Sequence, residues 1–325
     1  MHGWLILDKP YGLGSTQAVS AVKRALRVGG YGKAKVGHGG TLDPLASGVL
    51  PIAIGEATKL SGRMLDADKA YDFTIRFGSE TDTLDAEGPV IAESAVRPTL
   101  AEVEAVLPRF TGPIAQVPPA YSALKIEGKR AYDLARAGEE VTLASRDVVI
   151  KALSLEGEGW VRVSDIDRAV LGLRPRPPHP NPLPAGEREL EDVTLSALVS
   201  KGTYIRSLAR DIAYALGTVG HVTMLRRTKA GPFTLDQAIS LDKLDEAAKD
   251  ARLQALLLPL TAGLVDTPVL CLTPEQALAL RQGKKLFGIA APPGLTLGVL
   301  GEIPVALIDV ADETTVVRGF NLVSE

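Results

Sequence analysis

The chain has 325 residues, a mass of 34.3 kDa and a formal net charge of −3, with 46% hydrophobic and 23% charged residues. This composition is that of a globular protein and excludes a disordered chain, and the length indicates one large domain with a smaller one. The single cysteine, Cys271, excludes an internal disulfide and a cysteine-based zinc site, and the four histidines lack metal-ligand spacing. We therefore expect no metal site, and we also expect no secretion signal. We expect no membrane span, because the longest apolar run, 253–265, is short and contains Pro259.

Basic residues concentrate in two segments of this acidic chain. Residues 23–36 hold five lysines and arginines and no acid, and residues 201–230 hold six against Asp211, so the two segments carry +10 and the rest carries −13. Basic stripes on an acidic protein favour a polyanionic partner. Solvated helix faces explain such runs as well, so charge alone leaves both interpretations open.

The periodicity of the apolar residues predicts a mixture of strands and helices. In chain order we expect a strand over 4–7, a helix over 16–26, a glycine-rich loop over 29–40, strands over 48–55 and 71–77, helices over 99–107 and 129–137, strands over 147–155 and 193–199, and a helix over 205–216. After residue 242 we expect helices to about 258, a helix from Pro274 capped by Thr273, and short strands over 298–308 and 315–322.

Two features indicate the domain organisation. Residues 173–189 contain six prolines, which prevent both helices and strand ladders, so we expect an extended insertion without a role in the chemistry. The helix and strands at the end of the chain predict a small separate α/β module. We therefore expect a large domain over 1–245 and a small module over 262–325.

The segment 37–48 has four glycines in twelve residues and contains Asp43 followed by Pro44. It is neither a phosphate-binding Walker loop nor a dinucleotide-binding fingerprint, because neither glycine pattern is complete. Asp43 before a proline is typical of a helix N-cap, but also fits a carboxylate held at the mouth of a cleft by a rigid loop. The pattern alone does not separate the two.

Two further residues are open to a structural and a functional interpretation, and a third feature favours a functional one. Tyr71 begins an alternating apolar strand face, so it is either a core aromatic or a stacking platform for a base. Arg206 lies where a strand end leads into a helix, either in solvent or paired with a carboxylate in a cleft. The segment 221–231 combines basic and apolar residues, as expected of a strand edge that contacts phosphates.

Five blocks, in order, resemble one known family. They are Leu7-Asp8-Lys9-Pro10-x-Gly12, the Gly-His-Gly-Gly-Thr-Leu-Asp-Pro-Leu-Ala-Ser-Gly-Val-Leu segment at 37–50, the tyrosine- and lysine-containing block at 118–136, Ser-Lys-Gly-Thr-Tyr-Ile-Arg-Ser-Leu at 200–208, and Leu-Arg-Arg-Thr at 225–228. Together they span about residues 4–240 and resemble the TruB-type bacterial tRNA pseudouridine-55 synthases. The departures are modest: Gly39, Val199 and the proline-rich insertion.

The resemblance implies a fold and a set of site residues. The implied fold is the α+β pseudouridine synthase fold, with a mixed, mainly antiparallel sheet flanked by helices and a small PUA-like C-terminal module for RNA. The implied catalytic residues are Asp43 and Arg206, which would pair, and the implied nucleotide contacts are His38, Tyr71, Tyr204 and Leu225. For contacts to the RNA backbone we expect Lys9, Lys23, Arg24, Lys33, Lys35, Lys125, Arg226, Arg227 and Lys229.

The implied reaction converts uridine 55 in the T-loop of tRNA into pseudouridine. It breaks the N1–C1′ bond, turns the base and forms a C5–C1′ bond, with no oxidation and no energy donor, so we expect no cofactor. The target base must be flipped out of the loop. Whether Asp43 attacks C1′, attacks C6 or assists proton removal from C2′ stays open.

We expect a monomeric cytoplasmic enzyme that acts on the T-arm stem-loop. Two other functions compete. The first is a tRNA-binding or tRNA-folding protein without catalysis, which the presence of Asp43 and Arg206 disfavours. The second is a glycoside hydrolase with paired carboxylates, which needs a second acid near Asp43 that the sequence does not identify.

Overall fold

The structure of the chain is a computed structural model that describes residues 1–322 except 123, 127, 138–142 and 156–188. The proline-rich insertion that the sequence predicts over 173–189 therefore lies, up to residue 188, outside the described residues. Among the described residues no helix is long and apolar enough to cross a membrane.

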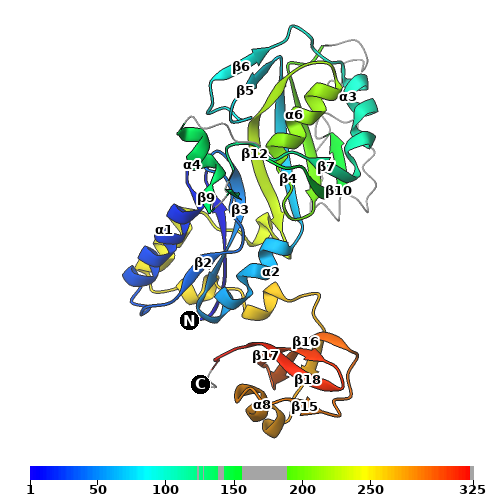
Figure 1. The fold of residues 1–325 in the computed structure, drawn as a ribbon. Helices are drawn as coiled ribbons and strands as arrows, with labels where there is room; N and C mark the ends of the chain where they lie inside the picture. Colours follow the sequence, from blue (N-terminus) through cyan, green and yellow to red (C-terminus); the bar gives the residue numbers. More distant parts are fainter. Residues whose placement is uncertain (123, 127, 138–142, 156–188, 323–325) are drawn as a thin grey trace, which may run out of the picture.

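A nine-stranded mixed sheet forms the centre of the larger part of the molecule (Figure 1). Its order is β1-β3-β12-β4-β11-β10-β7, with β2 beside β3 and β13 beside β12. The strands are β1 (Gly3–Lys9), β2 (Val36–His38), β3 (Ser47–Ile54), β4 (Lys69–Phe77), β7 (Gly112–Gln116), β10 (Arg146–Leu155), β11 (Asp192–Val199), β12 (Gly220–Ala230) and β13 (Phe233–Thr234). All pairs are antiparallel except β3 with β12, which confirms the predicted α+β class with a mainly antiparallel sheet.

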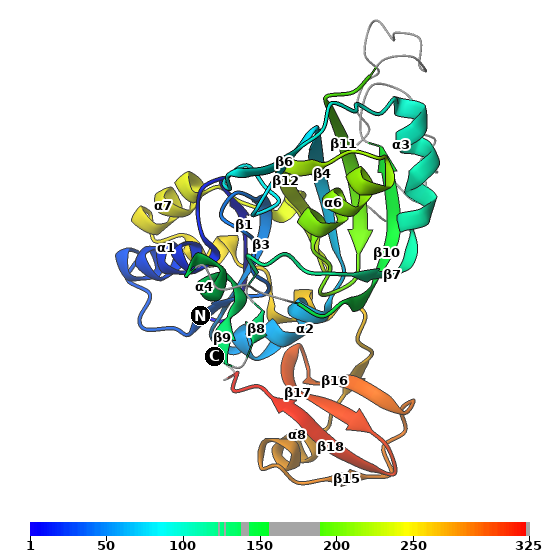
Figure 2. The same cartoon turned by 45° about the horizontal axis from the view of Figure 1, so that its top comes forward.

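Helices and short turns connect and cover these strands. They are α1 (Ser15–Val28), η1 (Gly55–Leu60), α2 (Ser61–Asp66), α3 (Leu100–Val106), η2 (Leu107–Phe110), α4 (Ala131–Arg136), α6 (Ile205–Ala215), η3 (Leu235–Gln237), α7 (Leu241–Lys249), η4 (Leu253–Leu256) and η5 (Leu260–Gly263). Apolar faces of α1, α3, α6 and α7 share one buried core with alternate residues of the strands (Figure 2). On β4 these are Phe73, Ile75 and Phe77, as the period-two pattern predicts.

The C-terminal part folds as a five-stranded sheet with one helix. The order is β14-β16-β17-β18-β15, from β14 (Val269–Cys271), β15 (Leu286–Phe287), β16 (Gly294–Leu300), β17 (Ile303–Val310) and β18 (Glu313–Gly319), and α8 (Pro274–Arg281) packs on it. Thr273 caps α8 with the predicted reciprocal hydrogen bonds to Gln276. Both views place this part below the large sheet, and a second apolar core that includes Trp4, Ile6 and Phe320 joins them.

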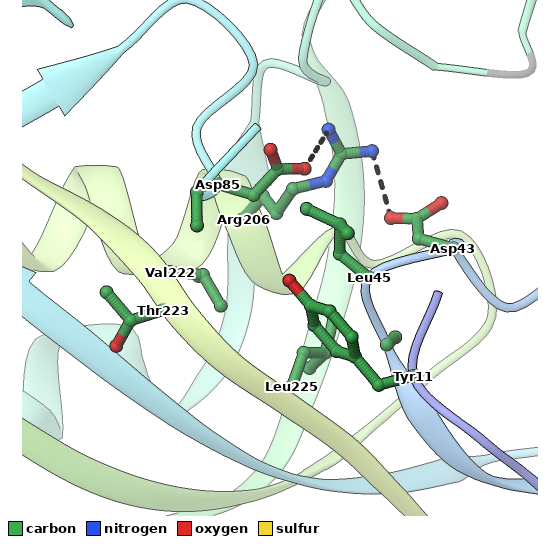
Figure 3. Close-up of a pocket in the computed structure, with 10 residues that line it drawn as sticks. Tyr11, Asp43, Leu45, Asp85, Arg206, Val222, Thr223 and Leu225 are labelled. Atoms are coloured by element: carbon green, nitrogen blue, oxygen red, sulfur yellow. Dashed lines mark ion pairs between the residues drawn. The ribbon is translucent and has the colours of Figure 1, made fainter. Parts of the chain in front are cut away.

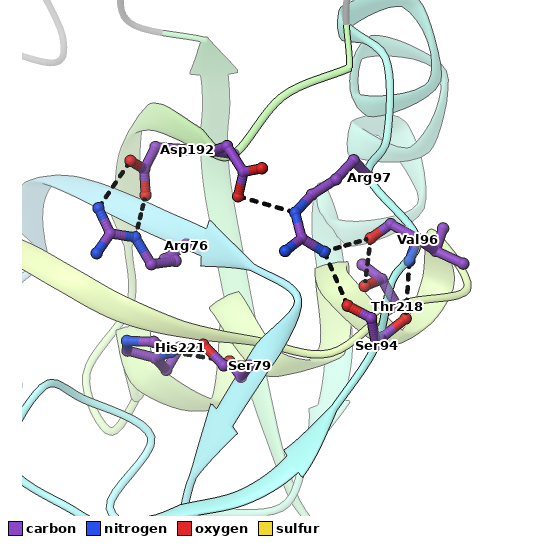
Figure 4. A network of polar contacts seen from close by, with 9 residues as sticks. Arg76, Ser79, Ser94, Val96, Arg97, Asp192, Thr218 and His221 are labelled. Carbon is purple, nitrogen blue, oxygen red and sulfur yellow. Dashed lines mark hydrogen bonds and ion pairs between the residues drawn. The ribbon is translucent and has the colours of Figure 1, made fainter.

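β5 (Ser79–Thr81) and β6 (Val90–Glu93) form a hairpin. It lies at the end of the large sheet where Phe77 of β4 pairs with Gly220 of β12. Polar contacts fix it there (Figure 4). Arg97 donates to the Ser94 carbonyl at 2.8 Å and pairs with Glu191 at 2.9 Å, and the Nδ1 atom of His221 lies 2.8 Å from the Ser79 carbonyl oxygen. The turn of this hairpin reaches the site described below.

Three sequence predictions are corrected in detail. The predicted loop over 29–40 contains the short strand β2, which pairs with β3 through main-chain hydrogen bonds that composition does not reveal. The predicted helix over 129–137 begins at Ala131, after the two-residue strands β8 (Lys125–Ile126) and β9 (Lys129–Arg130). The predicted strand over 298–308 is interrupted at Gly301, whose φ of +60° forms the turn between β16 and β17.

Candidate active site

Asp43 lies in the turn that leads from the glycine-rich loop into β3. No helix begins at Pro44, because residues 44 and 45 form a turn, so Asp43 is not a helix N-cap. Its carboxylate is 40% exposed, and its Oδ2 atom lies 2.9 Å from Nη2 of Arg206 (Figure 3). The structure thus contains the ion pair that the resemblance implies, between residues 163 positions apart in the sequence.

Arg206 is placed by the first turn of α6. The preceding residue in the chain, Ile205, is buried in the core, and Tyr204 is the N-cap. The side chain of Gln116, at the end of β7, holds Tyr204: its amide nitrogen donates to the Tyr204 carbonyl at 3.1 Å, and its oxygen accepts from the Tyr204 N–H at 2.8 Å. The sequence does not predict this role of Gln116, because its hydrogen-bond partner Tyr204 lies 88 residues further along the chain and no local pattern connects the two.

Arg206 has a second carboxylate partner that the sequence did not reveal. Asp85 Oδ2 lies 3.3 Å from Arg206 Nη1, and Arg206 also donates to the carbonyls of Thr83 at 2.8 Å and Tyr121 at 3.0 Å. Asp85 itself accepts from the Thr83 hydroxyl at 2.6 Å. Between these two residues, Leu84 has a φ of +60°, a conformation costly for leucine that persists where the surroundings fix the backbone. The guanidinium is thereby held in one orientation.

A cavity of about 320 Å³ opens beside the ion pair. Of the predicted site residues, Asp43, Tyr71, Tyr204, Arg206, Leu225 and Arg227 line it, together with Lys69, which was not predicted. Tyr71 is half-buried: it packs against the core and also lines the cavity. Burial raises the pKa of Tyr204, which keeps its hydroxyl neutral.

A much smaller hollow lies on the other side of the ion pair, with Tyr11, Leu45 and Asp85 around it (Figure 3). Asp43, Arg206 and Leu225 line both spaces. The ion pair therefore borders both spaces; its carboxylate is accessible, whereas its guanidinium is only 7% exposed.

His38 lies in β2 and is not among the residues that line the cavity. It is half-buried, and its Nδ1 atom lies 3.4 Å from the Gly40 nitrogen. Burial, with a smaller contribution from the charge of Arg227, lowers the pKa of His38, so the imidazole is neutral at pH 7.

The residues predicted to contact the RNA backbone divide into two groups. Lys23, Lys33 and Lys35 are exposed on α1 and the segment after it, Arg24 is exposed and pairs with Asp245, Lys229 is half-buried on β12, and Arg226 pairs with Asp8 at 2.8 Å. Lys125 lies in β8, and its side chain is outside the described part. Lys9 and Arg227 are buried, which the run of basic residues did not indicate.

Lys9 and Arg227 turn inward and are corrected from surface contacts to buried groups. Lys9 Nζ donates to the carbonyls of Leu13 at 2.6 Å and Pro44 at 3.3 Å. The Arg227 guanidinium donates to main-chain carbonyls of the glycine-rich loop and β3. These cations satisfy buried backbone oxygens instead of facing a phosphate.

Two buried lysines near the site have lowered pKa values. Burial, together with a smaller contribution from the charge of Arg227, lowers the pKa of Lys9 and of Lys69 to about 8 in each case. Lys69 Nζ donates to the carbonyls of Leu65 and Ala67, each at 2.6 Å. Within the described residues no cluster of histidine, cysteine, aspartate and glutamate side chains has the geometry to hold a metal ion.

The fold is shared with solved structures. The chain resembles a chain of the archaeal box H/ACA sRNP Nop10-Cbf5 complex with a TM-score of 0.66 and 22% identity, covering 98% of this chain and 86% of that one. A chain of a Cbf5-Nop10-Gar1 complex gives a TM-score of 0.65 and 24% identity, covering 99% and 84%. These similarities show the pseudouridine synthase fold that the sequence predicts.

Family models and relatives are more specific. Residues 26–161 match the N-terminal domain of the TruB family of pseudouridylate synthases, and residues 206–265 match the C-terminal domain of tRNA pseudouridylate synthase B. Proteins named tRNA pseudouridine synthase B from Novosphingobium aromaticivorans and Zymomonas mobilis are 60% and 56% identical, over 99% of this chain and 98% and 96% of theirs. The chain belongs to the TruB family, and as a pseudouridine synthase it is an isomerase.

Proposed function

We propose that this protein isomerises uridine 55 in the T-loop of tRNA to pseudouridine, with the uridine flipped into the 320 Å³ cavity and Asp43 as the reacting carboxylate. The observation that carries the proposal is the Asp43–Arg206 ion pair on the wall of that cavity. Family membership supports the reaction, and relatives named for tRNA support the substrate.

The cavity suits a detached base that must turn before it is joined again. Its volume falls within the range of roughly 300–1,000 Å³ that small-molecule sites occupy. Tyr71 and Leu225 offer apolar surfaces from β4 and β12, and Tyr204 closes the side formed by α6. A base stacked on Tyr71 gains about 1–3 kcal/mol, which offsets much of the cost of removing it from the RNA loop.

Arg206 acts on Asp43 in two ways. The guanidinium, 2.9 Å away, places a positive charge directly against the Asp43 carboxylate. Its contacts to Asp85 and to the Thr83 carbonyl fix its direction, so it also fixes the direction of the Asp43 oxygen. Arg206 is then the group that keeps the Asp43 carboxylate aimed into the cavity.

The RNA backbone contacts of the proposal are the exposed lysines of the first basic segment, Lys23, Lys33 and Lys35, together with Lys125, Arg226 and Lys229. Binding through phosphates weakens steeply with salt. The proposal includes a cytoplasmic enzyme that works as a monomer, with His38 near the target nucleotide and residues 1–245 and 262–325 as catalytic domain and RNA-binding module.

The direct test is site mapping. The purified protein is incubated with an unmodified tRNA transcript and no added cofactor, and pseudouridine is located by mass spectrometry at nucleotide resolution. We expect one pseudouridine, at position 55, and none in a matched transcript with cytidine there. Tight binding without conversion would instead identify a non-catalytic tRNA-binding protein, and conversion at other positions would disprove the specificity for uridine 55.

A further inference from the structure

One side chain binds both ends of the segment that carries Asp43. Arg227 Nε donates to the Val49 carbonyl at 2.7 Å, Nη1 to the Thr41 carbonyl at 3.1 Å and Nη2 to the Gly40 carbonyl at 3.2 Å. The guanidinium is planar and its N–H groups point in fixed directions, so one group spans two stretches of main chain that a lysine ammonium cannot hold at once.

The charge of Arg227 is buried without an acidic partner. The residue is 1% exposed, and among the residues that the structure describes no carboxylate lies within ion-pair distance of it. It also opposes the charges of two buried neighbours, Lys9 and Lys69. A buried cation of this kind costs free energy, and an apolar side chain would fill the same volume at lower cost. What an arginine provides at this position, and an apolar side chain would not, is therefore the set of hydrogen bonds to the segment that carries Asp43.

The main chain of β3 comes very close to the main chain of Arg227. Gly48 pairs with Arg227 in the parallel register of β3 with β12 and has a φ of +103°. A Cβ atom at Gly48 would lie 2.2 Å from the Arg227 carbonyl oxygen, so another side chain would push the two strands apart. Backbone and side chain of Arg227 thus hold β3 and the loop together.

The main chain on either side of Asp43 is held by hydrogen bonds, whereas the Asp43 carboxylate is held by Arg206. Ser15 Oγ donates to the Leu42 carbonyl at 2.8 Å and accepts from the Leu42 N–H at 2.9 Å. The Pro44 carbonyl accepts from Gly12 at 2.8 Å and from Lys9. With Arg227 closing the two ends of the segment, the main chain at Asp43 is fixed from α1, β1 and β12, and only its side chain faces Arg206.

We propose that Arg227 is a positioning residue for Asp43, which fixes the depth and direction of the carboxylate by joining Gly40 and Thr41 to Val49. This inference rests on the proposed function. A displacement of a reacting group by 1 Å can cost about 100-fold in rate. The loss on substitution falls on the chemical step rather than on RNA binding, because the hydrogen bonds of Arg227 go to the main chain.

The test compares Arg227→Lys with the wild type under single-turnover conditions, with protein in excess over tRNA. We expect the rate of pseudouridine formation to fall about 100-fold, while the dissociation constant for tRNA changes by less than about twofold. Arg76→Lys is the matched control: Arg76 lies on the neighbouring strand β4 and pairs with Asp192 at 3.0 Å (Figure 4). Its partner on β12 is His221, whereas Arg227 lies further along β12, opposite Tyr71. The rate of Arg76→Lys should equal that of the wild type.

Two further measurements separate positioning from general support of the fold. In Arg227→Lys the amide protons of Leu42 and Ala46, bonded to Ser15 and to the Asp43 carbonyl, should exchange faster, while those of β4 do not change. In Arg227→Ala, millimolar guanidinium should restore part of the rate, whereas sodium at equal ionic strength should not. A wild-type rate in Arg227→Lys, equal losses in rate and affinity, or loss of protection throughout the sheet would overturn the proposal.

The outcomes also distinguish this proposal from the proposed function. If the wild type makes no pseudouridine, the proposed function fails, and the exchange of Leu42 and Ala46 still reports whether Arg227 holds the loop. If the wild type is active and Arg227→Lys matches it, only the positioning role fails.

Discussion

Two buried arginines flank the glycine-rich loop and differ in their partners. Arg206 meets two carboxylates, Asp43 and Asp85, and faces a cavity. Arg227 meets three main-chain carbonyls and, within the described residues, no carboxylate. Arg206, with carboxylate partners, acts on a reacting group through its charge. Arg227, with main-chain carbonyl partners, holds the backbone in place. The same residue type thus orients the Asp43 carboxylate in one case and fixes the main chain of the loop in the other.

The largest expected effect on the Arg206 side comes from removing the guanidinium. Arg206→Met should lower the rate of pseudouridine formation by about 10²–10³-fold, as expected when one preorganised donor is lost, with tRNA affinity nearly unchanged. Single-turnover rates and filter-binding constants measure the two quantities. Equal losses in both would show that Arg206 only contacts phosphate.

This substitution leaves Asp85 buried without its cation, which can destabilise the fold. The double variant Arg206→Met with Asp85→Asn is therefore the control, because it keeps this interior neutral. Its rate should be as low as that of Arg206→Met, with thermal stability closer to the wild type.

A smaller effect is expected at the second carboxylate. Asp85→Asn removes the charge of one of the two carboxylates that pair with Arg206. Because a hydrogen bond to a charged group contributes about 1.5–3 kcal/mol net, we expect the rate to fall roughly 10- to 100-fold. The asparagine retains an acceptor for Thr83 and the shape of the turn. A rate equal to the wild type would mean that Asp43 alone orients Arg206.

The smallest effect concerns stability rather than turnover. Burial lowers the pKa of Lys69 to about 8, whereas an unfolded lysine titrates near 10.4. Between about pH 8 and pH 10.4 the unfolded chain binds more protons than the folded chain. Below about pH 8 the folded protein bears the whole free-energy cost of burying the Lys69 charge, and this cost decreases as the pH rises above 8. In this range the free energy of unfolding increases by at most about 1.4 kcal/mol per pH unit.

Denaturant unfolding of the wild type and Lys69→Met at several pH values measures this contribution. The wild type should gain stability relative to the variant from pH 8 to pH 10, while the titration of Lys9 affects both equally. A difference independent of pH would show that Lys69 titrates normally.

The elements with local signals were predictable. The alternation of Phe73, Ile75 and Phe77 predicted β4, and Thr273 with Gln276 predicted the start of α8. These patterns depend on period and capping, which a few neighbouring residues determine. The glycine-rich segment also drew attention to Asp43 before any partner was known.

The partners of the site were less accessible, because they are distant in the sequence. Nothing near Gln116 indicates Tyr204, and nothing near Asp85 indicates Arg206. Basic residues are usually exposed, so Lys9 and Arg227 were assigned to the RNA surface, although backbone carbonyls stabilise their charges inside the protein. Only the resemblance to a family connected Asp43 to Arg206 in advance.

The central claim is that the carboxylate of Asp43 reacts and does not merely bind. Asp43→Asn preserves shape and a hydrogen-bonding oxygen beside Arg206 but removes the charge. With protein in excess over tRNA, we predict no pseudouridine at position 55 and a tRNA dissociation constant close to that of the wild type. Conversion by Asp43→Asn at a rate near that of the wild type would contradict the account.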